Sequence, residues 1–142
     1  MRFHYLRPGT GDQLRDASVP ARFKAIVAIE EELDPKARDA VCDWLVASGC
    51  LYMMAWGAGC EIFYDCVDET IRDRHDFGDI PVGAGVVTTW HENEPLSEVM
   101  WFARFAAEHS VAVLQDVVLV HLSSVDRREE FKDLFERTMA GD

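Results

Sequence analysis

The sequence has no long apolar run, and this absence limits what the protein can be. Its longest uninterrupted apolar stretch, 50–56, is far shorter than the roughly 20 residues that a helix needs to span a bilayer. The first five residues also lack the apolar core of a secretory signal. We therefore expect no association with a membrane and a location in the cytoplasm.

Cysteines are few and irregularly spaced. Cys42, Cys50, Cys60 and Cys66 show neither the C-x-x-C spacing of zinc sites nor the dense framework of a disulfide-rich secreted protein. We expect reduced thiols, most of them buried as small apolar residues, and we assign no metal and no cofactor. Cys60 differs, because its place at the start of a helix could lower its pKa and make it reactive.

Basic residues are scarce. The chain has 14 of them against 26 acidic residues, which gives a net charge of −12. A field of this sign repels nucleic acid and anionic lipid surfaces. We therefore expect no nucleic-acid partner. A basic protein partner, or a ligand held with the help of a metal ion, fits this charge better.

Strand and helix patterns alternate along the 142 residues. Residues 1–21 contain an edge strand and a loop, and residues 22–140 contain four strand–helix units. We expect strands at 2–6, 23–29, 50–56, 86–90 and 117–122, and helices at 35–48, 60–74, 95–109 and from about 126. This alternation predicts one α/β domain over 1–142. Its fold should be small, Rossmann-like and doubly wound, with a mainly parallel sheet of four to five strands and helices on both faces.

The stretch WGAGCEI, 56–62, raises the question of a dinucleotide site. The G-x-G-x-x-G fingerprint needs a third glycine where this chain has Ile62, and it normally follows the first strand of the fold. Glu61 and Asp65 also lie in the first turns of the helix, where a phosphate would have to bind. The pattern therefore favours a tight structural turn.

Ligands of doubly wound folds bind beyond the carboxyl ends of the strands. At these ends the candidates for acid–base catalysis are His91, His121 and Glu92. The candidates for lining a ligand pocket are Glu30, Trp56, Gly57, Gly59, Thr89, Trp90 and Ser123. Each histidine has an alternative role, in which it only satisfies a backbone carbonyl group. The rim carboxylates favour a cation, but the sequence defines no coordination sphere for a metal.

The helix expected at 95–109 carries large aromatic residues on two sides. One face is apolar and can pack on the sheet, whereas Trp101, Phe102 and Phe105 point away from it. Three explanations remain open: the loop before the strand expected at 86–90 covers them, a second copy of the chain binds them, or another protein does.

Three segments resemble a known family. The stretches CDWLVASGCLYMMAWGAGC, HDFGDIP and TTWHENEPL are similar to those of small hypothetical bacterial proteins classed as a domain of unknown function. The likeness covers about residues 22–122. It implies a bacterial cytoplasmic origin and carries no activity or catalytic residue with it.

Two functions follow from these patterns as hypotheses. The first is a non-catalytic binding or regulatory module that associates with a protein partner or with itself. The alternative is a small-molecule enzyme, metal-assisted if a cation binds, with its site at the carboxyl ends of the strands. Charge and size favour the first, and the histidines at the strand ends favour the second.

Overall fold

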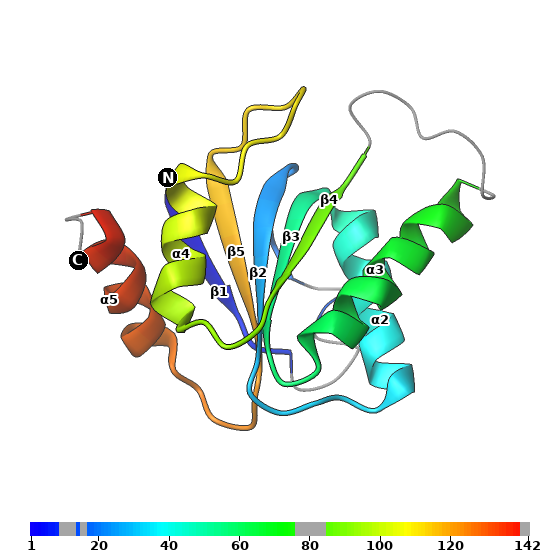
Figure 1. The fold of residues 1–142 in the computed structure, drawn as a ribbon, viewed down its shortest axis with the longest axis horizontal. Coiled ribbons are helices and arrows are strands. Elements are labelled where there is room, and N and C mark those ends of the chain that lie inside the picture. The colour runs from blue at the N-terminus through cyan, green and yellow to red at the C-terminus, as the bar shows by residue number, and fades with distance from the viewer. Residues whose placement is uncertain (9–13, 15–16, 76–84, 140–142) are drawn as a thin grey trace.

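The computed structural model describes residues 1–8, 14, 17–75 and 85–139, and in them a five-stranded, all-parallel sheet has the order β1-β5-β2-β3-β4 (Figure 1). In chain order the elements are β1 (Arg2–Leu6), β2 (Phe23–Ile29), α2 (Pro35–Ser48), β3 (Cys50–Gly57), α3 (Cys60–Arg74), β4 (Val87–His91), α4 (Leu96–Phe105), β5 (Asp116–Leu122) and α5 (Arg128–Met139). In this part of the chain, no helix is long and apolar enough to cross a bilayer.

Two layers of helices cover the sheet. Helices α2 and α3 pack on one face, and α4 and α5 pack on the other (Figure 1). Every residue of the central strands β2 and β5 is buried, as expected for parallel strands covered on both sides. The predicted Rossmann-like, doubly wound α/β fold is confirmed.

The chain reverses its direction across the sheet next to β2. From β2 it proceeds to β3 and β4, and it then returns to β5 on the other side of β2. At the lower edge of the sheet in Figure 1, the loop after β2 therefore leaves toward α2 and the loop after β5 leaves toward α5. This divergence creates the topological switch point, where doubly wound proteins bind their ligands.

Local sequence signals set the helix ends. Asp34 accepts a hydrogen bond from the N–H of Ala37 at 2.8 Å, Pro35 follows at the first helical position, and Gly49 ends α2 with a φ of 106°. Helix α4 ends at Phe105, not at the expected His109. There the N–H groups of Ala106 and Ala107 both bond to the carbonyl of Phe102, and this turn stops the helix.

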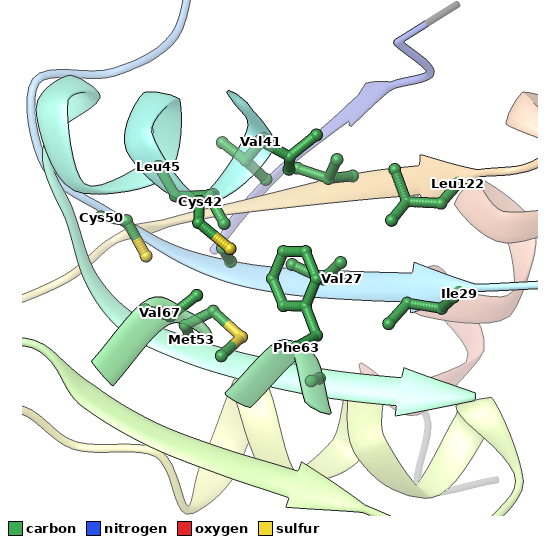
Figure 2. Packing of buried hydrophobic residues seen from close by; sticks show 14 of the residues in the cluster. Val27, Ile29, Val41, Cys42, Leu45, Cys50, Met53, Phe63, Val67 and Leu122 are labelled. Atoms are coloured by element: carbon green, nitrogen blue, oxygen red, sulfur yellow. The ribbon is translucent and has the colours of Figure 1, made fainter. Parts of the chain in front are cut away.

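The core on the α2 and α3 side is filled by side chains of five elements (Figure 2). Phe63 of α3 lies over Val27 with Cys42 beside it, and Cys50 lies farther away, at the start of β3. Burial raises the pKa of Cys50 to about 12, so this thiol stays protonated. The expectation of a reactive Cys60 is wrong. Its side chain is buried, and burial together with the charge of Glu92 raises its pKa.

Strand β1 is held at the sheet edge by one buried carboxylate. Asp116, at the start of β5, accepts hydrogen bonds from Arg2 at 2.9 Å and from His4 at 2.9 Å. Burial opposes the ionisation of Asp116, but these bonds from His4 and Arg2 outweigh it and lower its pKa. The carboxylate therefore joins the first strand to the fifth, which are more than 110 residues apart in the sequence.

Replacing Asp116 by Asn should lower the free energy of unfolding by about 2 kcal/mol at neutral pH, because two charge-assisted hydrogen bonds are weakened. Denaturant unfolding measures this, with the exposed Asp133→Asn as control. Since the pKa of Asp116 is lowered, the advantage of the natural protein is complete above pH 3.8 and shrinks as the pH falls further. If Asp116→Asn is as stable as the natural protein at neutral pH, this role of Asp116 is contradicted.

Candidate functional site

A chain of hydrogen bonds crosses the switch point. His121 of β5 is fully buried, and its Nδ1 lies 2.5 Å from the hydroxyl of Tyr5 while its Nε2 lies 2.5 Å from Oε1 of Glu30. The backbone N–H of Arg127 donates to the same hydroxyl at 3.1 Å. Burial raises the pKa of Tyr5, which outweighs the effect of the Arg127 bond and keeps the phenol protonated.

These partners fix one pattern of donors and acceptors. Tyr5 donates its proton to Nδ1 of His121, and Nε2–H of His121 donates to Glu30. The pattern joins β1, β5, the end of β2 and the start of α5. Both ring nitrogens of His121 are occupied, and Glu30, whose side chain is 30% exposed, also lies 3.3 Å from Nε of Arg127. The geometry therefore makes His121 a link between elements.

A second carboxylate ties the two diverging loops together. Oε2 of Glu31 accepts hydrogen bonds from the N–H of Ser124 at 2.6 Å, from its hydroxyl at 2.8 Å, and from the hydroxyl of Ser123 at 3.2 Å. The bonds from the backbone and side chain of Ser124 lower the pKa of Glu31 most. Ser123, a pocket candidate, is thus engaged in closing the switch point.

A separate group of candidates lies at the ends of β3 and β4. A solvent-open cavity of about 510 Å³ is lined by Trp56, Gly57, His91, Glu92, Asn93 and Glu94. Trp56 donates its indole N–H to the carbonyl of Glu94 at 2.6 Å, which fixes the ring beside the cavity. Asn93 has a φ of 59°, the left-handed conformation that lets the chain turn sharply there.

Within this group, three side chains form a hydrogen-bonded series. Nδ1 of His91 lies 2.7 Å from a carboxylate oxygen of Glu94, and Nε2 lies 2.9 Å from the hydroxyl of Thr89. The order hydroxyl, imidazole, carboxylate is that of a nucleophile, its base and the group that orients the base. Among the described residues, no group of three or more side chains is arranged to hold a metal ion.

The glycine turn after β3 serves packing. Gly57 and Gly59 have φ angles of 99° and 67°, and a Cβ atom would collide with the carbonyl of Ile29 at the first and with the carboxylate of Glu32 at the second. The cavity beside Gly59 measures only about 40 Å³, which is room for a water molecule but not for a nucleotide. The geometry favours a structural turn here.

The remaining aromatic candidates are separated in space. Trp90 lies on the α3 side of β4 against Tyr64, with ring centroids 4.6 Å apart. Phe102 is half-buried against Tyr52 and His91. Trp101 and Phe105 are 49% and 52% exposed, and their ring centroids lie 5.6 Å apart on α4. Of the loop that was considered as their cover, 75–85, residues 76–84 lie outside the described residues.

Five residues of these networks were not among the sequence candidates: Tyr5, Glu31, Glu94, Ser124 and Arg127. Tyr5 was placed on an edge strand, but nothing in its local pattern indicates that this strand pairs with β5. Glu94 had a weak signal, because it follows His91 by three residues in a turn. Arg127 had none, since its backbone N–H is the group that bonds to Tyr5.

Replacing Ser124 by Ala should raise the pKa of Glu31, because one of its three hydrogen-bond donors is lost. An NMR titration of the Glu31 carboxyl group measures this, with the exposed Ser18→Ala as control. We call the contacts of Glu31 with Ser123 and Ser124 the clasp. In the natural protein the pKa of Glu31 lies below 4.5, so the clasp stabilises the fold above that pH, and this stabilisation is lost as the pH falls through the lowered pKa. An unchanged Glu31 titration would contradict the clasp.

Comparison with known proteins gives one match. No curated protein and no solved structure matches the chain significantly. One family model covers residues 3–138, which includes most of β1 and of α5 and so extends beyond the resemblance at 22–122. The chain therefore belongs to the family described as a domain of unknown function, DUF7684.

Proposed function

We propose that the protein is a non-catalytic regulatory module of the bacterial cytoplasm that binds another protein through α4. The observation that carries this proposal is the exposed aromatic pair Trp101 and Phe105. Val113, which is 84% exposed, lines the same cavity as Phe105 and extends the apolar area. We call Trp101, Phe105 and Val113 the aromatic surface.

Burial of this surface would favour association. Aromatic side chains dominate the energetics of protein interfaces, and Trp in particular is common among the residues that matter most. The inner face of α4, with Val99, Met100 and Ala103, is already buried against the sheet. The aromatic surface is therefore in excess of what the fold itself needs from this helix.

Charge indicates what kind of partner fits. Glu98 lies one helical turn before Trp101, and Glu108 lines the cavity beside Phe105. Two copies of a chain with a net charge of −12 repel one another, whereas a partner with a basic rim is attracted. We therefore infer a basic protein partner in preference to a second copy.

Phe105→Glu should abolish partner binding while the fold survives, because it places a charge in the centre of a surface that is already exposed. Random peptides displayed on phage are selected against the natural protein, and each selected peptide is titrated against Phe105→Glu. Val125→Glu is the matched control, since Val125 is 52% exposed and lies in the loop after β5. We expect basic, aromatic-rich peptides that lose at least tenfold in affinity with Phe105→Glu only.

If the selected peptides bind Phe105→Glu as tightly as they bind the natural protein, the assignment of the aromatic surface as the binding site is overturned. Light scattering at low micromolar concentration provides the second readout, and we expect a monomer. If the natural protein is a dimer and Phe105→Glu dissociates it, the proposal of a different protein as partner is overturned, and the surface is assigned to a second copy of the chain.

A second candidate function has its own observation, the series Thr89–His91–Glu94 beside the cavity at the ends of β3 and β4. Trp56 offers an aromatic wall, and the exposed Glu92 and Glu94 offer negative charge. This combination suits acid–base chemistry on a small organic cation.

Choline is a suitable probe for this cavity. If the second function holds, choline binds with millimolar affinity and Glu92→Gln weakens it severalfold, because a carboxylate that faces the cation is lost. Calorimetry measures this, with the exposed Glu129→Gln as control. Absence of choline binding by the natural protein would argue against a cation site.

A further inference from the structure

A second cavity lies at the opposite, amino-terminal end of the sheet. It measures about 320 Å³ and is lined by Lys24, Arg104, Phe105, Ala107, Glu108, His109, Ala112, Val113 and Leu114. In Figure 1 this region is the upper edge, where the chain between α4 and β5 rises above the strands. Its size is at the lower end of the range for small-molecule sites, and its wall is divided between apolar and polar groups.

A buried lysine lines this cavity. Lys24, the second residue of β2, is only 5% exposed, and its Nζ donates to the carbonyl of Ala103 at 2.8 Å. Within the part of the chain that the structure describes, Lys24 forms no ion pair with a carboxylate. The buried Asp116 differs in this respect, because it contacts both Arg2 and His4.

An ammonium group in this position is energetically incomplete. Burial of a charge is costly unless an opposite charge and hydrogen bonds compensate for it. Burial lowers the pKa of Lys24, while the charge of Glu108 acts in the opposite direction. Two of the three ammonium protons remain for other acceptors, because Ala103 takes one.

The other charged groups around the cavity have defined roles. Arg104 donates to the hydroxyl of Thr138 and to the carbonyl of Phe135, and its guanidinium lies over the Phe135 ring. His109 bonds to the carbonyl of Gly85 through Nε2 and accepts the N–H of Ala112 at Nδ1, so it is a neutral ring that shapes the loop. The cavity thus combines two cations with one exposed carboxylate, in a protein that is otherwise strongly acidic.

We propose that this cavity binds a small carboxylate with an apolar body. The carboxylate of the ligand pairs with Lys24 and supplies the counter-ion that Lys24 does not find among the described residues. The apolar body lies against Phe105, Val113 and Leu114. The cavity shares Phe105 and Val113 with the aromatic surface, but the proposal does not depend on the protein-binding function, and its test leaves Phe105 unchanged.

The test uses hexanoate as the probe, with 1-hexanol and hexylamine as molecules of the same length that carry no charge or the opposite charge. Calorimetry or NMR titration is carried out on the natural protein, on Lys24→Met and on Lys36→Met. Lys36 is an exposed lysine at the start of α2 and serves as the matched control. We expect saturable hexanoate binding that falls at least tenfold in Lys24→Met and is unchanged in Lys36→Met, with weaker binding of both other probes.

Folding of the variant is a separate readout. A methionine of similar length replaces the buried ammonium without leaving an unpaired charge, so the thermal midpoint of Lys24→Met should equal or exceed that of the natural protein. The chain has three lysines, Lys24, Lys36 and Lys132, and their side-chain NMR signals can also be followed in the natural protein. Hexanoate should shift the Lys24 signals alone, so the test stands even if Lys24→Met fails to fold. Absence of hexanoate binding, equal binding to Lys24→Met, or binding of hexanol as tight as that of hexanoate would overturn the proposal.

Discussion

The burial of β2 and β5 on both faces is the constraint on which the rest of the structure depends. Their residues are apolar because helices cover both sides, so polar groups gather at the strand ends. Lys24 at the start of β2, Asp116 at the start of β5 and His121 near the end of β5 are the exceptions, and each must find its partners inside the protein. The chemistry of the molecule therefore concentrates at the two edges of one sheet.

At the carboxyl edge, several polar side chains bond to one another. His121 uses both nitrogens, Glu31 closes the gap between the diverging loops, and Tyr5 brings β1 and α5 into the same network. A switch point that is closed in this way has little bonding capacity left for a ligand. The cavity at the ends of β3 and β4 lies to one side of it, and this supports placing protein recognition on α4.

Much of the fold could be predicted from sequence, because its signals are local. The apolar run 23–29 gives β2, and the Asp34-Pro35 pair and Gly49 bound α2. The contacts that matter most for the sites are not local: Tyr5 and His121 are 116 residues apart, and only the strand order brings them together. The predicted end of α4 was wrong. The residues from Ala106 to Glu108 favour a helix by propensity, but the turn closed by the carbonyl of Phe102 ends the helix earlier.

Lys24 illustrates why a site can escape sequence reasoning. In the sequence it is a charged residue in an otherwise apolar strand. The simplest expectation is that its methylene groups pack against apolar neighbours while its ammonium group reaches solvent. The structure instead places the chain after α4 over it, so its ammonium is enclosed beside a cavity. Lys24 is a buried cation that has no carboxylate among its partners in the described residues, and it lies beside a cavity. Incomplete charge pairing next to open space is therefore a stronger indication of a ligand than the better-known position at the carboxyl ends of the strands.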